Sequence, residues 1–399
     1  MQLESEIPIT SREASRRFAG RLALFYGTLF GLTGIHLPFF PVWLRAIGLD
    51  PFWIGVIAAV PAVTRFTVLP VITGLAERHH ALRRALILTA FATALGLAAV
   101  GTQRLPVPVF LLYLATCCLW TPMVPLTDAY ALRGVMRYGL NYGRLRLWGS
   151  AAFVIGALAC GVLVDAIAAS RLIWAIVGVA GLGAAASLAL QPLDHLRPGA
   201  AVAHGEGALL RRGSFLAIIV AAALVQGSHA AYYAFASITW QAQGLGGLII
   251  AGLWALGVLA EIVVFALSPR FTLAPAMMVV IGGLSAAARW FITAQEPPLA
   301  VLAAVQLAHG LSFGMTQLGT MGLLVRQVPA HAMARGQGYY AACSGIISSS
   351  ASVLSGAVYA QYGQGAYYVM AAMAASGAVL MFSARPSLSR QPHSAASGG

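Results

Sequence analysis

Residues 85–100, ALILTAFATALGLAAV, contain no charged side chain and follow the pair Arg83 and Arg84. Comparable apolar runs occur at 215–225 and 299–305. A strand of a membrane barrel alternates between lipid-facing apolar residues and polar residues that face the lumen, and these runs have no such alternation. Because a helix pairs its backbone groups within its own segment, it can cross a lipid bilayer. The runs therefore predict membrane-spanning helices.

The overall composition supports the same fold class. Of the 399 residues, 59% are hydrophobic and 9% are charged, whereas a soluble domain carries about 25% charged residues. A spanning helix needs ~20 apolar residues, so the chain can form about twelve spans joined by short connections. We predict an all-α integral membrane protein with helices at 20–45, 51–75, 84–103, 107–131, 145–168, 171–192, 214–241, 246–269, 274–294, 298–325, 336–362 and 365–384.

The basic residues and motifs exclude several classes of enzyme. All 24 basic residues are arginine, and without lysine the chain can supply neither a P-loop lysine nor a Schiff base. No H-E-x-x-H zinc motif occurs, and the single G-x-S-x-G match, at residues 310–314, lies inside a predicted helix and not at the strand-to-helix turn of a nucleophile elbow. The four cysteines lie in apolar runs and are interpreted as packing residues. We therefore predict no catalytic residues, no bound metal and no cofactor.

The distribution of arginine predicts the orientation in the membrane. Nineteen arginines lie in the terminal segments or in alternate connections, three lie in the other connections, and Arg65 and Arg289 lie inside predicted helices. Positive residues are enriched on the cytoplasmic side of a membrane, so both termini are predicted to be cytoplasmic. Because this pattern accounts for the net charge of +13, we expect a lipid bilayer and not nucleic acid as a partner.

The longest connection divides the predicted helices into two groups of six. The predicted domains are a cytoplasmic tail (1–19), a six-helix bundle (20–192), a cytoplasmic linker (193–213), a second six-helix bundle (214–384) and a second cytoplasmic tail (385–399). Many secondary transporters consist of two similar halves. The division therefore favours a transporter.

Small residues mark the predicted helix contacts. Gly149, Gly156 and Gly161 lie on one predicted helix, and a stripe of serines recurs at four-residue spacing on the helix at 336–362. Small side chains let helix backbones approach closely in lipid. We interpret these positions as packing contacts, with substrate lining as the alternative.

Ionisable side chains inside a membrane cost ~2.5–3.5 kcal/mol each on insertion scales and mark candidate functional sites. Asp128 and Arg146 lie on consecutive predicted helices joined by a short turn, so they can meet across this hairpin. Arg146 would keep Asp128 ionised, and loss of this partner would let Asp128 bind a proton. The alternative is a static pair that only holds two helices together.

The second half of the chain contains a further set of such residues. Glu261 has no opposite charge nearby in sequence, so its carboxyl is either a proton carrier or a buried group bonded to backbone. Arg289 has a fork of donors that matches a carboxylate, which Glu261 or an anionic substrate could supply. His229 and His309 are candidates for the same site, although a lone membrane histidine often only joins two helices. Ser312 lies one turn after His309.

Two aromatic residues and one more arginine complete the candidates. Trp148 and Phe153 follow Arg146 on the same predicted helix. Rings beside a cation suit a ligand with an apolar ring and an acidic end, although most aromatic residues in such a protein only pack. Arg65 is a candidate either for the substrate cavity or for a structural pair.

Several motifs resemble a known family. Residues 74–84, GLAERHHALRR, resemble the loop after the second helix of the major facilitator superfamily, with Glu77 where aspartate is usual. Residues 141–150, NYGRLRLWGS, resemble the phenylpropionate permease branch of that superfamily, which is akin to lactose permease. The second half agrees with this branch at 228–233, SHAAYY, at 256–261, LGVLAE, and at 336–340, GQGYY. The resemblance covers essentially all twelve helices and implies the major facilitator fold with two six-helix bundles.

The resemblance also implies proton-coupled uptake by alternating access. Asp128 and Arg146 match, at the same separation of eighteen residues, the acid and the arginine that hold the sugar in lactose permease. Arg289 and His309, twenty residues apart, match an arginine and a histidine on its ninth and tenth helices. Glu261 matches its sugar-binding acid on the eighth helix.

Two departures from lactose permease concern coupling and substrate. Ser312 stands where lactose permease has its proton-carrying glutamate, so the proton would bind Glu261, Asp128 or His309 instead, or coupling would be absent. Phe153 stands where lactose permease stacks galactose on a tryptophan. A phenyl ring at this position favours an aromatic or apolar ligand over a sugar.

We predict a proton-coupled symporter that imports a small organic acid of 3-phenylpropionate type through a bacterial inner membrane. The predicted partners are this substrate, the coupling proton and lipid, and the chain is expected to act as a monomer. The alternatives are an oligosaccharide or nucleoside symporter, and a membrane sensor of the same fold that binds its ligand without transport. The predicted substrate-binding residues are Arg146, Asp128, Phe153, Trp148, Arg65, Arg289 and His229, and the predicted proton-coupling residues are Glu261, Asp128 and His309.

Overall fold

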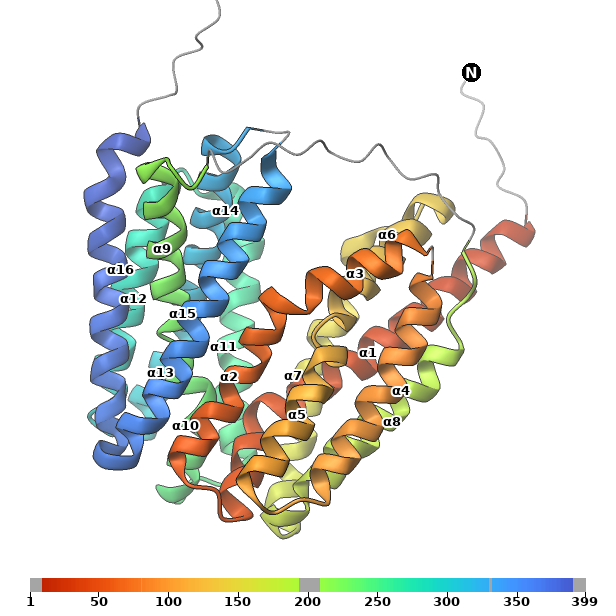
Figure 1. Ribbon diagram of the computed structural model, residues 1–399, viewed down its shortest axis with the longest axis horizontal. Helices are drawn as coiled ribbons and strands as arrows, with labels where there is room; N and C mark the ends of the chain where they lie inside the picture. Colours follow the sequence, from red (N-terminus) through yellow and green to blue (C-terminus); the bar gives the residue numbers. More distant parts are fainter. Residues whose placement is uncertain (1–8, 80, 194–208, 330–331, 390–399) are drawn as a thin grey trace, which may run out of the picture. The chain divides into compact units, whose positions relative to one another are not determined.

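The computed structural model describes residues 9–79, 81–193, 209–329 and 332–389, whose regular structure is entirely helical (Figure 1). Within these residues, ten helical segments are long and apolar enough to cross a membrane, or eleven if a bent pair of helices forms one span. One of these segments, Arg335–Leu388, contains the two helices α15 (Met333–Tyr362) and α16 (Ala366–Ser389), joined by the turn η5 (Gly363–Gly365). With the bent pair as one span and these two helices counted separately, the described residues contain twelve candidate spans, the number that the sequence predicts.

One compact unit contains the described residues up to 193 together with 235–255. The second part of α10 (Ala230–Ala242) and the first part of α11 (Gly247–Leu267) belong to this unit. Its other elements are α1 (Ile9–Ala46), α2 (Pro51–Thr67), α3 (Leu69–Arg78), α4 (Leu82–Gly101), α5 (Pro106–Trp120), α6 (Met123–Tyr138), α7 (Tyr142–Ala166), η1 (Ala169–Arg171) and α8 (Leu172–Leu188).

The other compact unit contains the described residues 209–234 and those from 256 onward. It contains the remaining parts of α10 and α11 and the whole of α15 and α16. Its other elements are α9 (Gly213–Gly227), η2 (Ser268–Arg270), α12 (Pro275–Thr293), α13 (Leu299–Leu307), the π-helical turn η3 (Gly310–Met315) and α14 (Thr316–Gln327). Most of the predicted linker and parts of both predicted tails lie outside the described residues. The predicted bundle boundaries, 20–192 and 214–384, therefore stay predictions.

Two helices that the sequence predicts as continuous are interrupted at proline. The predicted helix 51–75 consists of α2 and α3, which are bent by 45°. Pro70 lies in the first turn of α3 and has no backbone N–H to continue the hydrogen-bond ladder from α2. In the same way, the predicted helix 107–131 is divided into α5 and α6 around Pro122, which precedes α6.

Glycines bring α1 and α7 into close backbone contact. A Cβ atom built on Gly156 would lie 2.6 Å from the carbonyl oxygen of Gly31, and one on Gly34 would lie 2.2 Å from the carbonyl oxygen of Phe153. Further along α7, a Cβ on Gly161 would lie 2.6 Å from the carbonyl oxygen of Gly247 on α11. The predicted packing role of Gly156 and Gly161 is thus confirmed.

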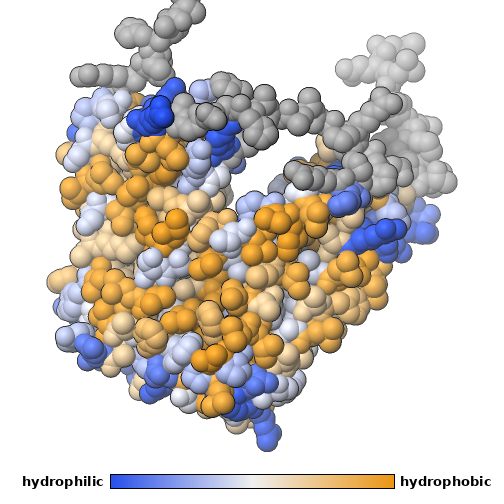
Figure 2. Space-filling model, viewed as in Figure 1, coloured by the Kyte–Doolittle hydropathy of each residue, from blue (hydrophilic) through white to orange (hydrophobic). Residues whose placement is uncertain are grey.

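Hydrophobic side chains cover much of the outer surface (Figure 2). Leu95 on α4 is 70% exposed, and Val325 on α14 is 69% exposed. Large apolar surfaces of this kind are unfavourable in water but suit contact with lipid chains. The surface therefore agrees with the spans that the helix lengths indicate.

Substitution of Gly34 by alanine tests the contact between α1 and α7. Because the new methyl group would lie 2.2 Å from the Phe153 carbonyl oxygen, the helices must separate, at a cost of ~1–3 kcal/mol. We expect Gly34→Ala to lower the thermal unfolding temperature of the purified protein in detergent. Gly27→Ala on the same helix is the matched control, since its Cβ meets nothing within 4 Å and alanine favours helix by ~0.5–1 kcal/mol. Equal unfolding temperatures for the two variants would contradict this packing.

Candidate functional site

Asp128 and Arg146 meet across the hairpin of α6 and α7. Helix α6 ends at Tyr138 and is capped by Gly139, whose φ of 62° lies in the left-handed region that glycine adopts without strain. Helix α7 then begins after Asn141, whose side chain accepts a hydrogen bond of 3.1 Å from the backbone N–H of Arg144. The hairpin brings Nε of Arg146 to 3.9 Å from Oδ1 of Asp128. This distance allows an ionic attraction but exceeds a hydrogen bond.

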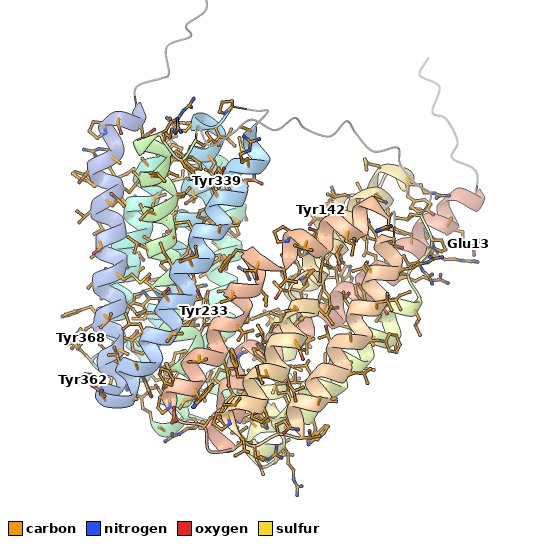
Figure 3. All side chains as sticks on the ribbon, in the orientation of Figure 1. Glu13, Tyr142, Tyr233, Tyr339, Tyr362 and Tyr368 are labelled. Atoms are coloured by element: carbon orange, nitrogen blue, oxygen red, sulfur yellow. The ribbon has the colours of Figure 1, made fainter. Side chains whose placement is uncertain are left out.

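Two aromatic residues of α1 complete this arrangement. The hydroxyl of Tyr26 donates a hydrogen bond of 2.6 Å to Oδ1 of Asp128. The guanidinium carbon of Arg146 lies 3.9 Å from the ring centroid of Phe30 and 5.8 Å from that of Tyr26. Tyr142, labelled in Figure 3, begins α7 and lies beside Asp128 and Tyr26. We call Tyr26, Phe30, Asp128, Tyr142 and Arg146 the Arg146 cluster.

Gly149 makes room for the contact between Phe30 and Arg146. A Cβ atom at this position would lie 2.7 Å from Cδ2 of Phe30 and 3.0 Å from Nη1 of Arg146. The absence of a side chain therefore lets the ring and the guanidinium meet against the surface of α7. This role is more specific than the general helix packing that the sequence predicts for Gly149.

The Arg146 side chain remains partly accessible. It is 32% exposed and Asp128 is 29% exposed. Within the part of the chain that the structure describes, Arg146 forms the long pair with Asp128 and the two ring contacts, but no hydrogen bond to a protein acceptor. A guanidinium carries five N–H donors in a planar fork. Donors of Arg146 are therefore available to another anion.

The other predicted residues of this unit differ in their placement. Phe153 lies seven residues after Arg146, on the same face of α7, and is 8% exposed. Trp148 lies two residues after Arg146, on the opposite face, and is 61% exposed. Arg65 is exposed near the end of α2. The structure thus brings Phe153 to the side of α7 that carries Arg146, but not Trp148, and Arg65 is not part of the cluster.

A second cluster surrounds Arg289 in the other unit. Arg289 is 1% exposed, and its Nε donates to the carbonyl oxygen of Val305 at 2.9 Å. Its Nη1 donates to Oγ of Ser312 at 2.8 Å and lies 3.1 Å from Nδ1 of His309. Its Nη2 donates to Oε1 of Gln306 at 3.3 Å. We call this group the Arg289 cluster. It consists of Arg289, Gln306, His309, Ser312 and also His229, which is described next.

His229 joins this cluster from the break between α9 and α10. Its Nε2 lies 3.4 Å from Nη1 of Arg289 and 3.4 Å from Oγ of Ser312. Its Nδ1 lies 3.2 Å from the carbonyl oxygen of Val225, which can only accept. The proton of a neutral His229 is therefore assigned to Nδ1, and Nε2 is an acceptor toward Arg289.

His309 connects Arg289 to Glu261. Because arginine can only donate, Nδ1 of His309 is the acceptor of their contact, and the ring proton is assigned to Nε2. Nε2 lies 3.8 Å from Oε2 of Glu261, whose side chain is 23% exposed. Glu261 therefore contacts His309. Among the described residues, no carboxylate forms an ion pair with Arg289, so its internal partners are neutral acceptors.

Ring faces also contribute to the surroundings of Arg289. Its guanidinium carbon lies 4.4 Å from the ring centroid of Trp290 and 5.5 Å from that of Tyr232. The Trp290 indole is held by a hydrogen bond of 2.9 Å from Nε1 to Oγ of Ser228. A desolvated cation gains energy from such rings. Together with the neutral acceptors, they stabilise a buried charge.

The π-helical turn η3 positions two members of the Arg289 cluster. It begins directly after His309 and contains Ser312. Gly310 allows close contact with α11, since a Cβ there would lie 2.5 Å from the carbonyl oxygen of Ala260. π-Helical turns often occur at functional sites. The sequence predicts one continuous helix at 298–325, which this turn interrupts, and the local signal for the turn is the pair Gly310 and Gly314.

Comparison with known proteins supports a transporter. A family model described as "MFS_1 like family" matches residues 20–370. The chain is 34% identical to the probable 3-phenylpropionic acid transporter of Escherichia coli (strain K12), over 88% of this chain and 94% of that protein. It is 31% identical to the maltose permease of Geobacillus stearothermophilus, over 73% of this chain and 75% of that protein.

Solved structures share the fold at low sequence identity. A mutant of the nucleoside transporter NupG matches with a TM-score of 0.80 and 14% identity, over 92% of this chain and 99% of that chain. A D-xylose-proton symporter matches with a TM-score of 0.69 and 12% identity, over 92% of this chain and 97% of that chain. From the family model and the relative in Escherichia coli, the chain belongs to the MFS_1 like family of major facilitator transporters, which are multi-pass membrane proteins.

Proposed function

We propose that the protein imports a small aromatic carboxylic acid, of 3-phenylpropionate type, together with a proton. The observation that carries this proposal is the partly exposed guanidinium of Arg146, which has donors free of protein acceptors among the described residues and lies against aromatic rings. Such a group suits a carboxylate attached to an apolar ring. The relative in Escherichia coli, a probable 3-phenylpropionic acid transporter, supports the same substrate class.

Arg146 is a better receptor for the substrate carboxylate than Arg289. Arg289 is 1% exposed, and its nitrogens already contact five neutral acceptors. A carboxylate would have to displace these contacts before it could bind. Arg146, at 32% exposure, can bind a carboxylate without such losses. In this proposal Phe153, on the same face of α7, lines the side of the site that receives the substrate ring, beyond Phe30 and Tyr26 at the guanidinium.

Glu261 is the proposed carrier of the coupling proton. Nδ1 of His309 accepts from Arg289, so a proton could bind there only by placing a second positive charge beside the guanidinium. Oε2 of Glu261 instead faces the N–H side of His309, and its side chain is 23% exposed. Glu261 can therefore exchange a proton while the contact between His309 and Arg289 is kept. Asp128 is the second candidate, through its link to the substrate site.

The same proposal assigns the location and the transport cycle. The chain lies in a bacterial inner membrane with both termini in the cytoplasm, as the arginine distribution indicates, and acts as a monomer. Substrate and proton drive alternating access by binding one conformation more tightly than the other, because a ligand shifts an equilibrium only through its differential affinity.

Uptake into proteoliposomes tests the proposed substrate and coupling. We expect labelled 3-phenylpropionate to accumulate when the outside is more acidic than the lumen, and only to equilibrate without this gradient. A sugar symporter is the rival that the 31% identity to a maltose permease favours. Uptake of maltose or a nucleoside without uptake of the aromatic acid would overturn the proposal. Saturable binding without flux would instead indicate a sensor.

Substitution of Arg146 tests the carboxylate receptor. Loss of the guanidinium removes charge-assisted hydrogen bonds to the substrate, so Arg146→Ala should lower kcat/KM for 3-phenylpropionate uptake by about 10–100-fold. Arg144→Ala, an exposed arginine two residues earlier on α7, is the matched control and should retain uptake. Wild-type kinetics in a folded Arg146→Ala protein would remove Arg146 from the site.

Substitution of Glu261 tests the proton carrier. Glutamine resembles the protonated carboxyl but cannot release a proton. Glu261→Gln should therefore retain exchange of labelled for unlabelled substrate across the liposome membrane and lose accumulation driven by a proton gradient. Glu296→Gln, in an exposed turn before α13, should retain both activities. Full gradient-driven accumulation by Glu261→Gln would show that another group carries the proton.

A further inference from the structure

Tyr26 and Arg146 approach the same oxygen of Asp128. The Tyr26 hydroxyl donates to Oδ1 at 2.6 Å, and Nε of Arg146 lies 3.9 Å from this same atom. A hydrogen bond from a hydroxyl to an ionised carboxylate has a length of about 2.5–2.7 Å. The neutral phenol thus holds the close contact, and the cation remains at a distance.

Burial explains why the phenol keeps this contact. Tyr26 is 0% exposed, so its buried hydroxyl needs a hydrogen-bond partner, and Asp128 supplies one at 2.6 Å. The Arg146 side chain is 32% exposed and can be solvated or can bind another anion. The arrangement is therefore favourable for Tyr26, and it leaves Asp128 beyond hydrogen-bond distance of Arg146.

We propose that Tyr26 is a positioning residue that sets the affinity of Arg146 for a carboxylate substrate. It does so by holding Asp128 at a distance at which the aspartate does not occupy the guanidinium. This inference rests on the proposed role of Arg146 as the substrate receptor. It extends that role, because Tyr26, on a different helix, would then determine whether Arg146 binds Asp128 or the substrate carboxylate.

The geometry also specifies the ligand class. Without the Tyr26 hydroxyl, Asp128 can turn toward Arg146 and close a direct ion pair, which has the same chemistry as a bound substrate carboxylate. Asp128 would then compete with an anionic substrate. A neutral sugar, which carries no carboxylate, would not meet this competition to the same degree. The position of Tyr26 thus favours anionic substrates.

Tyr26→Phe tests this inference because it removes the hydroxyl and keeps the ring beside Arg146. Equilibrium binding of labelled 3-phenylpropionate to the purified protein in detergent, without a proton gradient, should weaken about tenfold, equivalent to ~1.4 kcal/mol. Tyr130→Phe is the matched control, since Tyr130 is also buried and donates to the carbonyl oxygen of Gln191 at 2.7 Å. Its affinity should equal that of the wild type.

A double-mutant cycle distinguishes positioning from a general loss of structure. In an Asp128→Asn background the competing charge is absent, so adding Tyr26→Phe should leave the affinity of that background unchanged. An equal loss of affinity with and without Asp128→Asn would indicate only structural damage and would overturn the inference. Wild-type affinity in Tyr26→Phe would overturn it as well.

Chemical modification gives a readout that needs no substrate. Phenylglyoxal reacts with accessible guanidinium groups, and mass spectrometry can follow its reaction at Arg146. If Asp128 closes on Arg146 in Tyr26→Phe, the modification rate should fall several-fold, and Asp128→Asn should restore it. An unchanged rate would contradict the positioning role. If the wild type binds no aromatic acid, the proposed substrate is wrong, and these rates still decide the role of Tyr26.

Discussion

A charge in the low-dielectric interior of a membrane protein has to be compensated by its neighbours. The polar architecture of both units follows from this constraint. Arg289 is 1% exposed, and its compensation comes from a carbonyl, an amide, a hydroxyl, two imidazoles and two ring faces. Charged residues make up 9% of the chain. Each of those inside the membrane requires neighbouring groups that compensate its charge.

Close helix packing supplies the partners that this constraint demands. Gly31, Gly34 and Gly156 allow the backbones of α1 and α7 to touch, and this contact carries Tyr26 and Phe30 to Arg146. In the other unit, the π-helical turn that follows His309 fits against α11 through Gly310. The positions of the polar side chains therefore depend on glycines, which have no side chain of their own.

The sequence predicts the parts of the sites that depend on local geometry. Asp128 and Arg146 could be paired because a short turn joins their helices, and the spans could be predicted because apolar length alone defines them. Tyr26 and Phe30 were missed, since they lie over a hundred residues before Arg146 and look like ordinary helix residues. Trp148 was placed beside the ligand from its proximity in sequence, although two helical positions rotate it to the opposite face. The bend between α2 and α3 depends on Pro70, a signal present in the sequence that the length-based prediction did not use.

The two arginines differ in their neighbours rather than in their chemistry, and this difference bears on transport. A guanidinium that already uses its donors on fixed acceptors is stable in one arrangement and has little to gain from a ligand. A guanidinium whose counter-ion is held away by a third group is less satisfied, and a carboxylate can supply the missing contact. Because transport requires the ligand to be released as well as bound, an internal carboxylate close to that site is useful: Asp128 can stabilise Arg146 after the substrate leaves. The distance of 3.9 Å between them suits this exchange, since it is short enough for attraction and long enough for a substrate to compete.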